Sequence, residues 1–250
     1  MNTLLKKILD SGIVEDENGN QFQLHSHTSL KQGIFLQEIL EKIMPVKGVE
    51  VGLAYGVSSL FILDKMQELK GDGYKHIVIE PFPEGWNHVG ATNIQKAGFT
   101  DYVEIKKALS DQVLPQMYLD NERIQFAYID STKLFDVIFH DFYFIDKILD
   151  IGGVIVFDDC TFPGIRKVVR FIANHPSYKI LGALNEDFKT TKFSMVEKII
   201  TTVINLLPFK KRVYPTTSFK TDKSLGINYF CIAFQKIKND NRSFYWNENF

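Results

Sequence analysis

Short apolar runs that end in an acidic or glycine residue are the feature that most constrains the fold of this chain. Four such runs stand out, at residues 48–52, 76–80, 125–130 and 153–159. Segments with apolar residues at helical spacing separate them. Continuous apolar strands suit a parallel sheet that helices cover on both faces, because both strand faces are then buried. The pattern therefore predicts an α/β fold.

Weaker signals complete the expected organisation. A further strand is expected near residues 103–106, and helices near 35–44, 86–97, 112–119 and 165–173. We expect five parts along the chain: a helical N-terminal segment (1–45), a core (46–184), an insertion (185–225), a last sheet strand (226–238) and a tail (239–250).

The insertion breaks the strand and helix rhythm. It holds an expected helix at 195–206 and the basic cluster Lys210, Lys211 and Arg212. The insertion could form a lid or a subunit contact, such as that of a homodimer. Basic triplets of this kind are most often a solvated face.

Charge and composition narrow the class of protein. Of 250 residues, 45% are hydrophobic and 24% are charged, which is typical of a globular protein. With 29 basic and 30 acidic residues, no overall charge attracts nucleic acid or an anionic membrane. Cys160 and Cys231 are too few for a disulfide framework. No apolar run reaches the roughly 20 residues that cross a bilayer, and the N-terminus does not resemble a signal peptide. We therefore expect a cytoplasmic protein.

The first run leads into a glycine-containing turn and then a helix. Gly52 and Gly56 let a ligand approach the backbone closely, and the amides that open the helix can face an anionic group. This arrangement suggests a nucleotide-type ligand, although two glycines also fit an ordinary tight turn. Their spacing differs from the G-x-G-x-x-G dinucleotide fingerprint, which disfavours an NAD-linked oxidoreductase.

Glu80 ends the second run. A carboxylate at that position can accept hydrogen bonds from both hydroxyls of a ribose. The competing interpretation is a solvated strand end or a helix cap. Its place after the glycine turn favours the ribose.

Four blocks in this order resemble a known family. They are residues 50–59 (EVGLAYGVSS), 79–98 (IEPFPEGWNHVGATNIQKAG), 110–115 (SDQVLP) and the run from 126 through 152–159 to 166. The chain resembles class I S-adenosylmethionine-dependent methyltransferases, closest to the catechol O-methyltransferase-like group and its bacterial small-molecule and sugar O-methyltransferase relatives. The resemblance spans roughly residues 32–184 and the last strand. It implies a Rossmann-like fold with a seven-stranded, mostly parallel sheet and an antiparallel last strand.

The resemblance also implies a site. S-adenosylmethionine would be the cofactor, and the matching positions hold its methionine part, its ribose and its adenine in turn: Glu50, Gly52, Ala54, Gly56 and Ser58, then Glu80, then Ser110. Asp130, which also lies beside the cofactor, joins Asp158 and Asp159 at the acidic metal-binding positions. Lys133 falls at the catalytic lysine, paired with Asp130.

The three aspartates also suggest a metal site independently of the family resemblance. They end neighbouring expected strands about 4.8 Å apart, so their carboxylates would converge at one sheet edge. Oxygen ligands of this kind favour a hard ion such as Mg²⁺. The alternative is that Asp158 and Asp159 form a strand-end turn and Asp130 caps a helix.

Lys133 is the expected base for the acceptor hydroxyl. A lysine desolvated beside a metal ion could be neutral enough to take the proton, whereas most lysines lie on the surface. Many bacterial relatives carry Asp-Gly-x-His here, and this chain has Asp130-Ser131-Thr132-Lys133. Either the lysine replaces the usual group, or the chemistry has changed or been lost.

These observations predict an O-methyltransferase acting on a hydroxylated small molecule or sugar. A methyltransferase-fold protein that binds without catalysis is the alternative, followed by the NAD-linked enzyme. Nucleic-acid methylation is disfavoured, because residues 129–132 lack the Asn/Asp-Pro-Pro-aromatic tetrapeptide of amino-methylating DNA enzymes and the charge offers no phosphate track.

Overall fold

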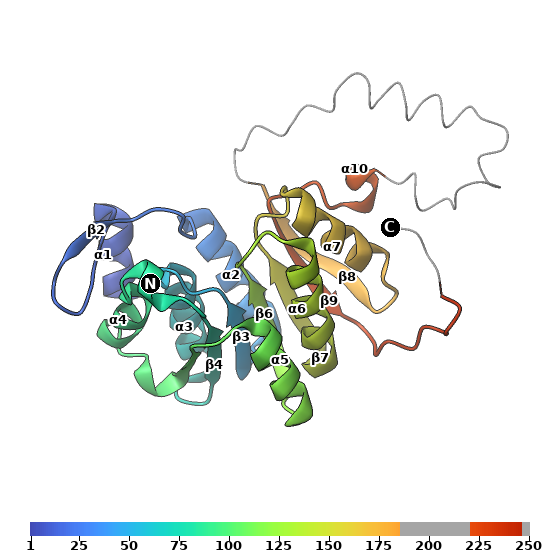
Figure 1. Cartoon of the computed structure of the whole chain (residues 1–250), viewed down its shortest axis with the longest axis horizontal. Coiled ribbons are helices and arrows are strands. Elements are labelled where there is room, and N and C mark those ends of the chain that lie inside the picture. Colours follow the sequence, from blue (N-terminus) through green and yellow to red (C-terminus); the bar gives the residue numbers. More distant parts are fainter. Residues whose placement is uncertain (186–220, 247–250) are drawn as a thin grey trace, which may run out of the picture.

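A seven-stranded sheet forms the centre of this computed structural model, which describes residues 1–185 and 221–246 (Figure 1). The strand order is β5-β4-β3-β6-β7-β9-β8. The first five of these strands in that order run parallel, and β9 pairs antiparallel with both β7 and β8. The strands are β3 (Lys47–Val51), β4 (Lys75–Ile79), β5 (Val103–Lys106), β6 (Ile124–Ile129), β7 (Leu149–Phe157), β8 (Tyr178–Leu184) and β9 (Cys231–Lys236). This sheet confirms the predicted fold, including its antiparallel last strand.

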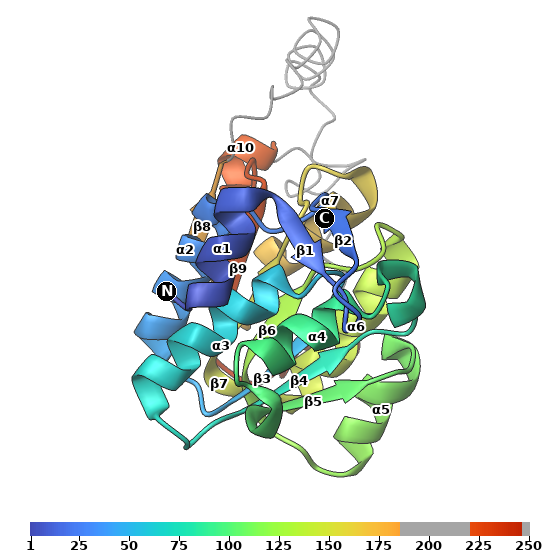
Figure 2. The same ribbon diagram turned by 90° about the vertical axis from the view of Figure 1, so that its left-hand side faces the viewer.

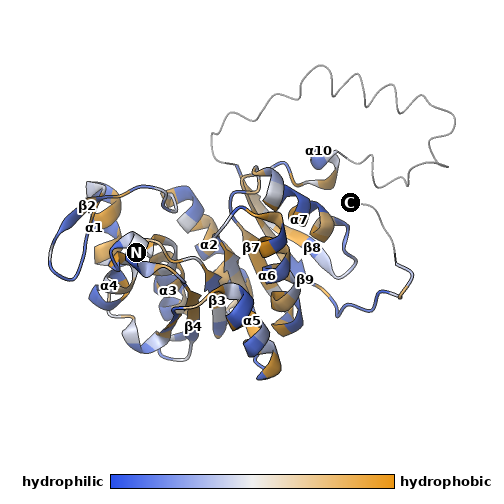
Figure 3. Cartoon of the chain, viewed as in Figure 1, coloured by the Kyte–Doolittle hydropathy of each residue, from blue (hydrophilic) through white to orange (hydrophobic). Residues whose placement is uncertain are grey.

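Helices cover both faces of the sheet (Figures 1 and 2). Side chains of α2 (Leu30–Ile43), α3 (Val57–Lys70) and α4 (Val89–Lys96) share one apolar cluster with Phe126 and Tyr128 of β6. Side chains of α5 (Ser110–Leu119), α6 (Phe135–Ile148) and α7 (Pro163–Asn174) share the other with Ala127 and Ile129. Alternate residues of one strand therefore enter two different cores, which explains why the strands read as unbroken apolar runs (Figure 3).

The N-terminal segment contains a hairpin in addition to helices. After α1 (Thr3–Ser11), the short strands β1 (Ile13–Glu15) and β2 (Gln21–Gln23) pair antiparallel. Residues 24–29 then lead into α2, whose first turn is closed by a capping box between Ser29 and Gln32. The sequence pattern predicted only helices here, because strands of three residues are too short to show alternation.

Several boundaries differ from the prediction for local reasons. The expected helix at 86–97 is divided into the 3₁₀ turn η1 (Pro83–Trp86) and α4, because Asn87 and His88 adopt left-handed backbone angles. A second 3₁₀ turn, η2 (Thr100–Tyr102), precedes β5. The short helix α10 (Asp222–Leu225) precedes β9. The helix expected at 195–206 and the basic cluster at 210–212 lie outside the described residues.

Two further expectations concern the cysteines and the membrane. Cys160 and Cys231 are buried and free, so neither forms a disulfide. Among the residues that the structure describes, no helix has the length and apolar character that a membrane span needs.

Candidate functional site

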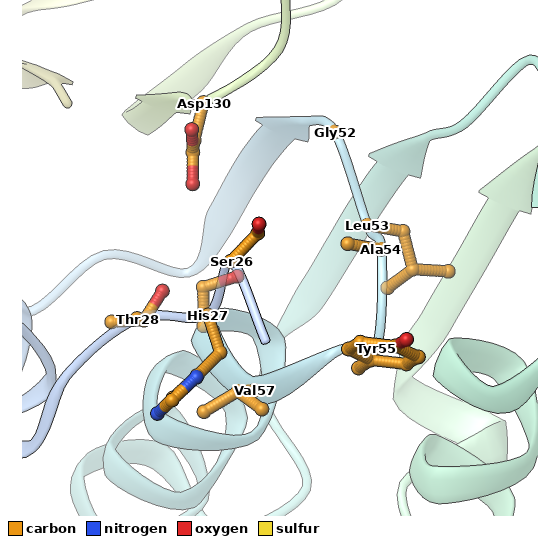
Figure 4. A pocket seen from close by; sticks show the side chains of 10 residues that line it. Ser26, His27, Thr28, Gly52, Leu53, Ala54, Tyr55, Val57 and Asp130 are labelled. Carbon is orange, nitrogen blue, oxygen red and sulfur yellow. The ribbon is translucent and has the colours of Figure 1, made fainter. Parts of the chain in front are cut away.

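A small, open pocket lies at the carboxyl ends of β3 and β6 (Figure 4). Asp130 directs its side chain into the pocket, with the glycine turn on one side and the N-terminal segment on the other. Ligands bind at this edge of open parallel sheets, where the strand order reverses. The lining residues are Ser26, His27, Thr28, Gly52, Leu53, Ala54, Tyr55, Val57, Ser58 and Asp130.

The turn that lines one side of the pocket requires glycine. Gly52 has a φ of 99°, a value that residues with a side chain rarely adopt. Its amide donates to the Ile79 carbonyl at 2.9 Å, so the turn is tied to the neighbouring strand. Gly56, with a φ of 75°, is the N-cap of α3. Gly52, Ala54 and Ser58 are thus predicted cofactor residues that do line the pocket, whereas Gly56 shapes the turn without lining it.

Glu80 accepts hydrogen bonds from the backbone of this turn. One carboxylate oxygen accepts from the amides of Leu53 at 3.0 Å and Ala54 at 3.2 Å, and the other accepts from the amide of Phe82 at 2.9 Å. The side chain is buried and is not among the pocket-lining residues. In this structure the predicted ribose acid therefore organises the loop that any ligand would meet.

Glu50 is fully buried and joins β3 to the start of α3. Its carboxylate accepts from the hydroxyls of Ser58 and Ser59, the latter at 2.6 Å, and lies 3.2 Å from Nε2 of His76. Three polar partners around one buried carboxylate offset its loss of hydration. Glu50 itself does not line the pocket, whereas its hydrogen-bond partner Ser58 does.

The N-terminal segment contributes residues that the sequence did not identify. Ser26, His27 and Thr28 line the pocket, although they are more than twenty residues from the glycine turn. His25 Nε2 and the Tyr55 hydroxyl are 2.8 Å apart, and the rings of His25, Tyr55 and Trp86 are within 5.1–5.7 Å of one another. No local motif marks these residues, because only the tertiary fold brings them to the turn.

Lys133 bridges two of the predicted acidic residues. Its ammonium nitrogen is 3.1 Å from Oδ1 of Asp130 and 2.5 Å from Oδ2 of Asp159. Burial lowers the pKa of Lys133, but the charges and hydrogen bonds of the two carboxylates outweigh it and raise the pKa above its ordinary value. Burial also raises the pKa of Asp130, against the opposing effect of Lys133. In this arrangement the lysine is a cation, whereas a base must first lose that proton.

Asp158 is turned toward α2 instead. Both of its carboxylate oxygens accept from Nε2 of Gln32, at 2.9 and 3.0 Å, and the Tyr128 hydroxyl donates to Oδ2 at 3.1 Å. Burial, followed by the charges of Asp130 and Asp159, raises the pKa of Asp158 to about 8.

The structure therefore does not assemble the predicted metal site of Asp130, Asp158 and Asp159. Within residues 1–185 and 221–246, no group of three or more His, Cys, Asp or Glu side chains is placed to hold a metal ion. The physical reason is that a lysine lies between two of the carboxylates and an amide and a phenol engage the third.

Ser110, the residue predicted to lie beside adenine, begins α5 and is buried outside the pocket lining. Asp141 of α6 is a nearby charged group. Its side chain is fully buried, and this burial raises its pKa to about 6.

Comparison with known proteins agrees with this geometry. Residues 49–160 match the sequence model of a methyltransferase domain family. Among solved structures, an O-methyltransferase from Bacillus cereus in complex with SAH is 23% identical, with a TM-score of 0.58 over 72% of this chain and 83% of that one. The O-methyltransferase TomG from Streptomyces achromogenes, in complex with SAM and involved in tomaymycin synthesis, is 20% identical, with a TM-score of 0.58 over 72% and 82%.

A third structure, the SAH-bound methyltransferase PaMTH1 from Podospora anserina, is 14% identical, with a TM-score of 0.57 over 72% of this chain and 83% of that one. The comparison with curated proteins finds no match. The chain thus has the fold of these methyltransferases, and residues 49–160 match a methyltransferase domain family. This confirms the resemblance seen in the sequence.

Proposed function

We propose that the protein transfers a methyl group from S-adenosylmethionine to a hydroxyl of a small molecule, including a sugar. The observation that carries the proposal is the pocket that the glycine turn and Asp130 line together. A donor on the turn and an acceptor beside Asp130 would then be neighbours. The solved relatives described as O-methyltransferases with SAM or SAH support the same donor and the same kind of acceptor atom.

The donor would lie across the carboxyl ends of β3 and β4. Gly52 and Ala54 leave its methionine part access to the backbone, and Ser58 faces it from the start of α3. Glu80 is the proposed ribose partner. It holds the amides of Leu53 and Ala54 in place now, and a carboxylate has further lone pairs for a hydroxyl. Ser110 is proposed to lie beside the adenine.

Lys133 and Asp130 are the proposed catalytic pair. Methyl transfer breaks the bond between sulfur and carbon, whose electrons remain on sulfur, and forms a bond from carbon to the acceptor oxygen. The acceptor must lose its proton in the same reaction. Asp130, a carboxylate whose pKa is raised by burial, is placed to accept that proton. The Lys133 ammonium can donate a hydrogen bond to the oxygen as its negative charge develops.

This assignment revises the role expected for Lys133. As the base it would need to be neutral, and the two carboxylates favour its charged form. As a hydrogen-bond donor it acts in the charged form that they favour. Both versions place the lysine at the acceptor oxygen, and they differ in which group ends with the proton.

Calorimetric titration of the full chain with SAH and with NAD⁺ tests the donor assignment. We expect saturable binding of SAH and none of NAD⁺; NAD⁺ binding without SAH binding would overturn the proposal. Transfer of a labelled methyl group is then measured against a panel of hydroxylated small molecules and sugars. SAH binding without transfer to any acceptor would favour the non-catalytic alternative.

Lys133→Met separates catalysis from donor binding. The variant loses the ammonium but keeps a long side chain of similar reach. We expect unchanged SAH affinity and a loss in kcat of about 10²-fold or more, in line with the contribution of a group that acts on a proton or a developing charge. Unchanged kcat would remove Lys133 from the reaction while leaving the donor assignment intact.

A further inference from the structure

The carboxylates predicted to bind a divalent ion have other partners in this structure. Such a site needs several oxygen ligands directed at one point, and Mg²⁺ in particular tolerates little departure from octahedral geometry. Asp130 and Asp159 do converge, but on the side-chain nitrogen of Lys133. The third residue, Asp158, has both oxygens engaged elsewhere.

The direction of the Gln32 amide is fixed by the helix cap. The side-chain Oε1 of Gln32 accepts from the backbone amide of Ser29 at 2.8 Å. In return, the Ser29 hydroxyl accepts from the backbone amide of Gln32 at 3.3 Å. The NH₂ group of Gln32 must therefore point the other way, toward Asp158. An NH₂ group donates hydrogen bonds and does not ligate metal ions. This contact therefore holds the Asp158 carboxylate against helix α2.

Asp159 pairs with Lys133 from an unusual backbone conformation. Its φ of 53° lies in the left-handed region, which is uncommon for a residue with a side chain. The lysine nitrogen is within hydrogen-bond reach of Asp159 and of Asp130, and the side chains of all three are only partly exposed. Two carboxylates close together repel each other unless a cation compensates them, and here a side chain of the same chain supplies it.

We infer that the ammonium group of Lys133 is the built-in cation of this site and occupies the position between Asp130 and Asp159 that a divalent ion would need. The protein therefore keeps these carboxylates together without a metal ion. This inference rests on the ion pairs alone and does not depend on the proposed methyl transfer.

Mn²⁺ binding to the full chain, followed by electron paramagnetic resonance, tests the inference without an activity assay. The Lys133→Met variant should show a saturable Mn²⁺ site. The wild-type protein should show none over the same Mn²⁺ concentrations, so the variant should bind Mn²⁺ at least tenfold more tightly. Adding Asp159→Asn to Lys133→Met should abolish the gain. The control is Lys65→Met, because Lys65 also pairs with an acidic residue three positions away, Glu68 at 2.8 Å, on the surface of α3. It should bind Mn²⁺ as the wild type does.

Two results would overturn the inference. One is a wild-type site for a single Mn²⁺ ion that Asp130→Asn or Asp159→Asn removes, since the carboxylates would then hold a metal beside the lysine. The other is a folded Lys133→Met variant that binds Mn²⁺ no better than Lys65→Met. Lys133→Arg, which keeps the positive charge, should behave as the wild type and shows that charge, not the loss of packing, governs the result.

Discussion

Gly52 lies directly against the backbone carbonyl of Asp130: a Cβ atom placed on residue 52 would stand 2.0 Å from that oxygen. The turn after β3 and the end of β6 therefore touch through their backbones. Since both residues line the pocket, the spacing between the proposed donor and acceptor positions depends on this contact. A side chain at residue 52 would have to separate two neighbouring strands at the edge where the ligands are expected.

Gly52→Ala should therefore damage stability and binding together. The substitution combines an unfavourable φ of 99° with a backbone clash, and we expect it to lower the free energy of unfolding by about 3 kcal/mol or more. SAH affinity should fall as well. Urea denaturation and calorimetry measure the two effects.

Gly98→Ala is the matched control for Gly52→Ala. Gly98 also has a positive φ, 82°, but a Cβ atom added there would have nothing within 4 Å of it. The substitution should cost only the backbone strain, about 1–2 kcal/mol, and leave SAH affinity unchanged. Equal losses in the two variants would mean that the contact with Asp130 carries no weight.

Glu80→Gln tests the carboxylate that holds the turn. The amide of glutamine has one acceptor oxygen, so its NH₂ group would face one or more backbone amides that now have a partner at 2.9–3.2 Å. We expect SAH affinity to fall at least tenfold and stability to fall by about 1–3 kcal/mol. Glu84→Gln, which removes an exposed partner of Lys107, should change neither measurement. A tenfold loss in both variants would point to net charge rather than to the turn.

Asp141 should make the protein less stable as the pH rises. Its pKa is raised from 3.8 to about 6 by burial, so between these values the folded state binds more protons than the unfolded state. Stability from this group is fully present at low pH and is lost as the pH rises through 6. Asp141→Asn removes the dependence and should add about 2 kcal/mol to the free energy of unfolding at pH 7.5, relative to its effect at pH 4.5.

Urea denaturation at the two pH values measures this difference. Asp136→Asn, at an exposed position on the same helix, is the control and should not reproduce the gain. If Asp141→Asn destabilises the protein equally at both values, the carboxylate is not the source of the pH dependence.

The parts of the fold that the sequence predicts are those buried on both sides. β3, β4, β6 and β7 read as unbroken apolar runs because their alternate residues enter two cores. β8 lacks such a signal, since most of its residues are only half-buried and it contains Gly182. The β1 and β2 hairpin is too short for any periodicity.

The candidate site divides in the same way. Gly52, Glu80 and Asp130 stand at strand ends, and the topology of a parallel sheet brings strand ends together, so their position could be predicted. The partners of Asp158 could not. Gln32 is 126 residues away in sequence, and only the packing of α2 against the sheet brings the two together. The position of the Lys133 ammonium between Asp130 and Asp159 could not be predicted either, because it depends on side-chain directions that the strand order does not determine.

Tyr55→Phe tests whether the N-terminal segment retains the ligand. The change removes the hydroxyl that lies 2.8 Å from His25 Nε2 but keeps the ring, whose centroid is 5.1 Å from that of Trp86. Residues 26–28 line the pocket next to this hydrogen bond. Its loss should lower the free energy of local unfolding of these residues by about 1 kcal/mol. We expect faster amide hydrogen exchange at residues 25–29 and faster dissociation of SAH.

Tyr74→Phe provides a control of the same chemistry away from the pocket. The Tyr74 hydroxyl donates to Gln67 at 3.1 Å, and its ring stacks on Tyr102 at 4.8 Å. Its loss should cost a similar free energy of unfolding, because both tyrosines are buried and each gives up one hydrogen bond. SAH dissociation should keep its wild-type rate in this variant. Equal dissociation rates in wild type and Tyr55→Phe would show that residues 26–28 line the pocket without holding the ligand in it.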